Sequence, residues 1–192
     1  MQQTVNYSYT DLSRSSHLGM KHILGPFSKS SLTSVQAGDS QPNAVDLRLG
    51  KVFRILPNVF EITNDTKKHR GSEEIIPDKE DFYTLEPGHY EVVMENIIHV
   101  GEHEAGWVIT RSTLNRNGLF LTSGLYDSGY GIDAKTGEKV GGMMAGVLHV
   151  QVGPARIKKG TRIGQFILFN AEMLHRYDGD YGNHKNHDKK YS

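Results

Sequence analysis

The chain has 192 residues, with 22 Lys and Arg against 22 Asp and Glu, and contains no cysteine. This length predicts one domain whose hydrophobic core needs no covalent staples. The balanced charge argues against a general nucleic-acid binder, and the lack of cysteine excludes a disulfide framework, a thiolate zinc site and a zinc-dependent nucleobase deaminase. The sequence has no run of about 18 apolar residues, so no membrane span is expected.

The first residues, 1–19, show no hydrophobic period and are predicted to form an N-terminal arm or leader. They are polar and lack the apolar stretch of a signal peptide, so a cytoplasmic location is expected. Residues 21–35 have room for one short helix, which Gly25 and Pro26 would interrupt.

From residue 43 onwards the pattern is typical of short strands. Apolar and polar residues alternate in part of 44–56, and further strands are predicted at 89–100, 106–110, 146–152 and 162–169. The charged segment 64–81 is predicted to be an exposed loop, and the glycine-rich segment 131–142 a hairpin tip. Short strands separated by turns indicate an all-β sandwich or barrel with little helix.

The final segment, 177–192, is polar and is predicted to be a flexible tail that cannot build core. Its His184 and His187 are interpreted as solvent-exposed tail residues rather than metal ligands. The expected organisation is therefore an arm at 1–19, a β domain at 20–176 and this tail.

Three short stretches carry candidate chemistry. "RSTLNR" places Arg111, Ser112 and Arg116 together, and guanidinium and hydroxyl groups suit phosphate oxygens. Asp127 follows an apolar run in "GLYDSGY", and Gln165 lies in the predicted strand "RIGQF". Taken singly, each stretch has a simpler explanation: surface ion pairs, a turn aspartate and a barrel-lining amide.

Taken together, "AVDLRLG", "RSTLNR", "GLYDSGY" and "RIGQF" resemble the successive motifs of the dUTPase and dCTP deaminase superfamily. The resemblance extends from about Gln41 to Gly182, and the chain looks most like archaeal-type dUTPases of the deaminase-like branch. It implies a jelly-roll-like β-barrel subunit, with homotrimers whose sites lie between subunits.

The resemblance also implies roles for individual residues. Asp127 would be the general base that activates water for attack on the α-phosphorus of dUTP, giving dUMP and pyrophosphate. Mg²⁺ would be held by phosphate oxygens and water, with no direct protein ligand. The implied nucleotide contacts are Arg111, Ser112, Thr113, Arg116 and Gln165 for the phosphates, Ser123, Gly124, Leu125 and Tyr126 for the pyrimidine, Tyr130 for the deoxyribose, and Tyr177 in a closing tail.

Two acidic positions fit the resemblance less simply. Asp46 matches a family position but is interpreted mainly as a structural hydrogen-bonding residue. Asp180 lies where the deaminases usually have glutamine, and a carboxylate there would sit poorly beside phosphates.

One position separates the two activities of the superfamily. Deaminases carry a glutamate on the strand after the Asp127 turn, and the corresponding residue here is Gly146. The nearby carboxylates, Asp133 and Glu138, lie in an apparent insertion at 131–142. The first hypothesis is therefore a dUTP diphosphatase that acts on a deoxyuridine nucleotide as a homotrimer, without nucleic-acid or membrane partners. The alternatives are a zinc-independent dCTP deaminase, with or without dUTPase activity, and a non-catalytic nucleotide-binding regulatory module.

Overall fold

Strands make up most of the regular structure in the computed structural model, which describes residues 19–182, 185 and 187–191. Residues 1–18 of the arm predicted at 1–19, and His184, lie outside this range. Its elements are β1 (Met20–Lys21), β2 (Ser31–Leu32), β3 (Val45–Ile55), β4 (Glu61–Ile62), β5 (Lys67–Lys68), β6 (Ser72–Ile75), β7 (Phe82–Leu85), β8 (Gly88–His99), β9 (Glu104–Thr110), α2 (Ser112–Arg116), β10 (Leu119–Thr122), β11 (Gly142–Val150), β12 (Ala155–Lys158), β13 (Arg162–Asn170) and the 3₁₀ turn η2 (Asp188–Tyr191). The predicted all-β fold with little helix is confirmed, and no helix in the described part is long and apolar enough to cross a membrane.

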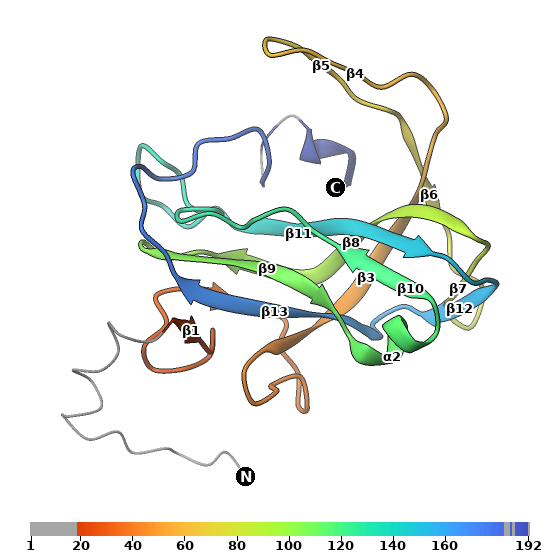
Figure 1. Cartoon of the computed structure of the whole chain (residues 1–192), viewed down its shortest axis with the longest axis horizontal. Helices are drawn as coiled ribbons and strands as arrows, with labels where there is room; N and C mark the ends of the chain where they lie inside the picture. Colours follow the sequence, from red (N-terminus) through yellow and green to blue (C-terminus); the bar gives the residue numbers. More distant parts are fainter. Residues whose placement is uncertain (1–18, 183–184, 186, 192) are drawn as a thin grey trace.

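The main sheet curls until its two ends meet (Figure 1). Its strand order is β1-β13-β3-β8-β11-β10, and β9 pairs with β13 beside this path. Side chains join β9 to β10: the Thr110 hydroxyl bonds to both the N–H and the C=O of Leu121, and the Val108 N–H donates to Ser123 Oγ at 3.0 Å. The sheet is thereby closed into a barrel.

The barrel interior is filled by the apolar side of the alternating strands. Leu47, Leu49, Val92, Leu148 and Ile163 are each fully buried. Because successive strand residues point to opposite faces, this alternation leaves the outer face free for polar groups. The strands predicted at 44–56, 89–100, 106–110, 146–152 and 162–169 correspond to β3, β8, β9, β11 and β13.

Three predictions about the remaining segments need correction. Residues 21–35 contain no helix, because the backbone turns at Gly25 and then forms β2 against β8. The predicted loop 64–81 contains β5 and β6, and β6 pairs with β3. The tail does contribute buried surface, since Tyr191 packs edge-on against Phe53 with ring centroids 5.3 Å apart.

A buried carboxylate fixes the start of β9. Glu104 is fully buried and accepts hydrogen bonds from Lys21 Nζ at 2.7 Å, Ser30 Oγ at 2.6 Å and the Lys29 N–H at 2.9 Å. Its backbone C=O accepts from Ser128 Oγ at 2.7 Å. One residue therefore connects the N-terminal segment, β9 and the loop that follows Asp127.

Replacing Glu104 with Gln is expected to lower the free energy of unfolding by about 3–5 kcal/mol, because the Lys21 ammonium would stay buried without its partner. Urea denaturation followed by fluorescence measures this change. The neighbouring Glu102→Gln is the control: it removes an exposed contact to Arg176 and should leave the midpoint nearly unchanged. Equal midpoints for the two variants would show that the buried pair is not a stabilising contact.

Candidate active site

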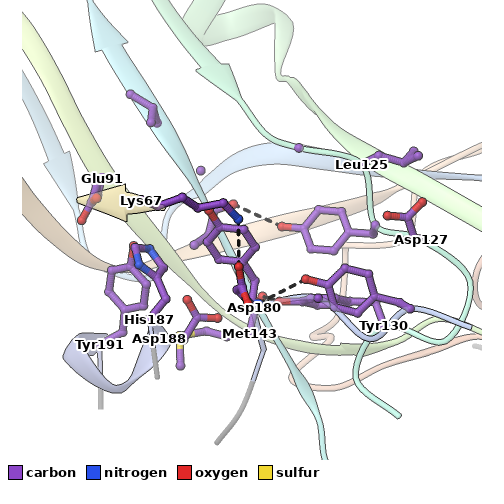
Figure 2. Close-up of a pocket in the computed structure, with 18 residues that line it drawn as sticks. Lys67, Glu91, Leu125, Asp127, Tyr130, Met143, Asp180, His187, Asp188 and Tyr191 are labelled. Carbon is purple, nitrogen blue, oxygen red and sulfur yellow. Dashed lines mark hydrogen bonds and ion pairs between the residues drawn. The ribbon is translucent and has the colours of Figure 1, made fainter. Parts of the chain in front are cut away.

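A pocket of about 700 Å³ lies on the outer face of β8 and β11. This volume is within the range of small-molecule sites. Three segments supply most of its wall (Figure 2): the loop Gly124, Leu125, Tyr126, Asp127 and Tyr130, the strand residues Met143, Ala145, Gly146 and Val147, and the tail residues Tyr177, Gly179, Asp180, Tyr181, His187, Asp188 and Tyr191. Lys67 and Glu91 complete it.

The loop that carries Asp127 is held by its backbone on both sides. Tyr126 exchanges two hydrogen bonds with Gly106 of β9, at 2.8 and 3.1 Å. Ser128 is buried and donates to Glu104, and the Gly129 N–H donates to the Val100 C=O. Asp127 itself is exposed, and within the described part of the chain no hydrogen bond engages its carboxylate. A fixed loop thus presents a free carboxylate at the pocket.

Two tyrosines form the wall behind Asp127. Tyr126 and Tyr130 are buried, and their hydroxyls donate to the backbone C=O groups of Ala145 at 3.2 Å and Met143 at 2.7 Å. Burial raises the pKa of both phenols, so both stay protonated at neutral pH. The rings pack edge-on with centroids 5.3 Å apart, and Tyr177 packs on Tyr130 in the same way. These aromatic contacts attach the tail to the pocket.

Gly146 lies on β11 directly before Val147, which pairs with Thr122 of β10. A Cβ atom placed on this residue would come within 2.4 Å of the Thr122 C=O, closer than real Cβ atoms approach. The backbone therefore has no room for any side chain here, let alone a carboxylate. A proton donor at this position would require β10 and β11 to move apart.

The carboxylates of the 131–142 segment do not replace the missing group. This segment is a hairpin tip as predicted, with Ile132 bridged to Lys139. The Asp133 carboxylate accepts from the N–H groups of Lys135 at 2.9 Å and Thr136 at 2.7 Å, and these bonds lower its pKa. Asp133 and Glu138 are both absent from the described lining of the pocket.

Two of the predicted phosphate-binding residues, Arg111 and Gln165, contact Asp46. Asp46 is fully buried and receives Gln165 Nε2 at 2.9 Å, while Arg111 Nε and Arg162 Nη1 lie 3.4 Å from its carboxylate. Ser112, Thr113 and Arg116 are exposed on α2, directly after Arg111. The arrangement agrees with a structural role for Asp46, which orients Arg111 and Gln165.

The two groups of predicted site residues lie at opposite ends of β9 (Figure 1). Tyr126 is bridged to Gly106, and Arg111 lies five residues further along. At about 3.4 Å per strand residue, the backbone of Arg111 is about 17 Å from that of Gly106, the partner of Tyr126. An arginine side chain cannot cover that distance, so one subunit does not bring Arg111 and Asp127 to one phosphate.

Some of the pocket lining was not predicted from the sequence. Lys67 lies in a charged segment and Glu91 lies on a strand. Neither residue belongs to one of the sequence motifs. His187, interpreted as exposed, is half-buried, with its ring centroid 4.2 Å from that of His69 and 4.9 Å from that of Tyr181. Among the described residues, no group of three His, Cys, Asp or Glu side chains is suited to hold a metal ion.

Comparison with known proteins agrees with this architecture. The sequence model of a family described as dCTP deaminase-like matches residues 25–171. The chain belongs to this family. It is 29% identical over 143 residues to a protein of Methanopyrus kandleri named probable deoxyuridine 5'-triphosphate nucleotidohydrolase, covering 74% of this chain and 86% of that one.

Other similar proteins are named for the deamination of dCTP. A protein of Salinispora tropica named dCTP deaminase, dUMP-forming, is 29% identical over 135 residues, covering 67% of this chain and 65% of that one. The crystal structure of 2'-deoxycytidine 5'-triphosphate deaminase from Agrobacterium tumefaciens has a similar fold, with a TM-score of 0.57 at 15% identity. The match covers 82% of this chain and 49% of that one.

Replacing Gly146 with Ala is expected to lower the free energy of unfolding by about 1–3 kcal/mol, because even a methyl group meets the Thr122 backbone. Thermal or urea denaturation measures the loss. Gly124→Ala is the matched control, since a Cβ there has open space and the residue lies in the same pocket wall. A Gly146→Ala protein as stable as Gly124→Ala would show that β11 does have room for a side chain.

Proposed function

We propose that the protein is a dUTP diphosphatase, which hydrolyses dUTP to dUMP and pyrophosphate. The observation that carries this proposal is the free Asp127 carboxylate on a fixed loop, beside a β11 position that has no room for a proton-donating side chain. The name of the relative from Methanopyrus kandleri points to the same activity.

In the proposed mechanism Asp127 accepts a proton from the water that attacks the α-phosphorus. The carboxylate is suited to this role because it is exposed and its loop is tied to β9 on both sides. Positioned general bases contribute roughly 10²–10⁴-fold to rates. The exposed backbone at Ser123, Gly124 and Leu125 would contact the pyrimidine edge, and Tyr130 would pack against the deoxyribose.

Mg²⁺ suits this pocket as a phosphate-bound ion rather than a protein-bound one. The described residues offer no cluster of three metal-binding side chains, and Mg²⁺ commonly binds substrate phosphates while keeping several waters. When bound, it would offset phosphate charge in the transition state. The pocket carboxylates Asp127 and Asp188 suit a hydrated cation brought in with the triphosphate.

The phosphate clamp would come from a second copy of the chain. Arg111, Ser112, Thr113, Arg116 and Gln165 lie too far from Asp127 in one subunit, so a shared site needs an oligomer, and we propose a homotrimer. Trp107, Ile109 and Phe120 lie on β9 and β10 and are 41%, 38% and 43% exposed. Apolar groups gathered in this way are typical of a surface that a partner covers.

We further propose that the tail from residue 177 closes over the bound nucleotide, and that residues 20–176 form the β domain. Tyr177, packed on Tyr130, and Tyr191, packed on Phe53, already line the pocket. Closure would exclude water other than the attacking molecule.

A dCTP deaminase is the second candidate, favoured by the name of the Salinispora tropica relative. Loss of ammonia from cytosine needs a proton donor at the base, and Gly146 supplies none. With Mg²⁺ present, we expect the protein to release pyrophosphate from dUTP and no ammonia from dCTP. The two products are assayed separately. If the protein releases ammonia from dCTP but no pyrophosphate from dUTP, it is a dCTP deaminase and not a dUTP diphosphatase.

Asp127→Asn is the control for this assay. The amide keeps the shape of the side chain but cannot accept the proton, so turnover should fall by roughly 10²–10⁴-fold while nucleotide binding persists. Near-normal turnover in this variant would remove Asp127 from the mechanism.

Mixing two inactive variants tests the shared site. Arg116→Ala and Asp127→Asn should each lack activity, but co-expressed mixed oligomers combine an intact Asp127 from one subunit with an intact Arg116 from another. Random assortment restores on the order of a quarter of the sites. Pyrophosphate release by purified mixed oligomers measures the recovery. If verified mixed oligomers stay inactive, the clamp and the base do not come from different subunits.

A further inference from the structure

The β4–β5 hairpin supplies one charged side chain to the pocket. The turn is closed by backbone and hydroxyl bonds between Thr63 and Thr66, at 2.9 and 2.8 Å. Lys67 follows this turn and reaches from β5 across the pocket toward the tail (Figure 2). None of the sequence motifs includes this hairpin, so the proposed phosphate clamp leaves Lys67 without a role.

The charges lining the pocket make Lys67 distinctive. Glu91, Asp127, Asp180 and Asp188 contribute carboxylates, whereas Lys67 is the sole Lys or Arg among the described lining residues. Glu91 is matched from outside the pocket by Lys190, whose Nζ lies 2.9 Å from both carboxylate oxygens. A polyanion that enters this pocket therefore meets a single ammonium group from the same subunit.

The Lys67 ammonium group is paired with the carboxylate of Asp180, which another anion can displace. Lys67 Nζ lies 2.8 Å from Asp180 Oδ2, and the two side chains are 45% and 69% exposed. Such exposed ion pairs contribute little to stability because water solvates both ions. Phosphate groups carry more charge and more acceptor oxygens than one carboxylate, so they compete well for an ammonium group.

The tail does not need this ion pair to stay in place. Tyr177 packs on Tyr130 and Tyr191 on Phe53, each with ring centroids 5.3 Å apart. Breaking the contact between Lys67 and Asp180 leaves these aromatic contacts untouched. The ion pair is therefore poorly explained as a latch for the tail.

We propose that Lys67 is a phosphate ligand for the triphosphate bound in this pocket, and that Asp180 occupies its ammonium group when no phosphate is present. Lys67 has this role only if the pocket takes a triphosphate, so the proposal rests on the proposed function. It gives Asp180 a purpose: the carboxylate is a weak internal competitor that keeps weaker anions off Lys67.

The opposite effects expected for the two partners test the proposal. Isothermal titration of the full-length protein with α,β-imido-dUTP, and separately with inorganic tripolyphosphate, measures binding. Lys67→Met should weaken binding of both ligands about tenfold, because it removes a charged hydrogen bond. Asp180→Asn should tighten both by roughly two- to fivefold, because it removes the competitor. Lys68→Met is the matched control: Lys68 is exposed on the same strand, does not line the pocket, and should bind as wild type does.

Two results with the variants would count against the role of Lys67. Unchanged binding by Lys67→Met would overturn it, and so would equal weakening by Lys67→Met and Asp180→Asn, which would indicate a latch. The tripolyphosphate titration separates this proposal from the proposed function. If wild type binds tripolyphosphate through Lys67 but not the dUTP analogue, the phosphate ligand stands and the dUTPase assignment falls. If wild type binds neither ligand, both fall.

Discussion

The position of the Asp127 loop depends on the buried carboxylate of Glu104 and its hydrogen bonds. A buried charge is costly unless it is paired and hydrogen-bonded, and Glu104 obtains its partners from Lys21, Lys29 and Ser30. The same residue accepts the Ser128 hydroxyl through its backbone. The N-terminal segment, the start of β9 and the residue next to Asp127 are therefore fixed by one set of bonds.

From this fixed end, β9 sets the distance between the two groups of predicted site residues. Its first residues hold the Asp127 loop, and its last residue leads into Arg111 and α2. Closure of the barrel through Thr110 and Ser123 keeps the strand rigid against β10. A rigid strand cannot bring its two ends together. If Asp127 and Arg111 act on one nucleotide, as proposed, they must therefore come from different subunits.

Backbone packing and charge shape the pocket. The close approach of the Thr122 C=O to Gly146 leaves no room for a side chain on β11 at this point. The same pocket keeps the Asp127 carboxylate free and pairs Asp180 with Lys67. In the proposed function, the first feature leaves the pyrimidine amine without a proton donor, and the second leaves Asp127 available to activate water.

The sequence by itself determined the strands and the motif residues. Alternation of apolar residues predicts a strand whenever one face is buried, which is why β3, β8, β9, β11 and β13 were found. Only the tertiary structure decided the pocket, since Lys67 and Asp180 are 113 residues apart in sequence yet in contact. The burial of Tyr191 was missed for a related reason: a polar segment gives no local sign of the distant Phe53 ring on which Tyr191 packs.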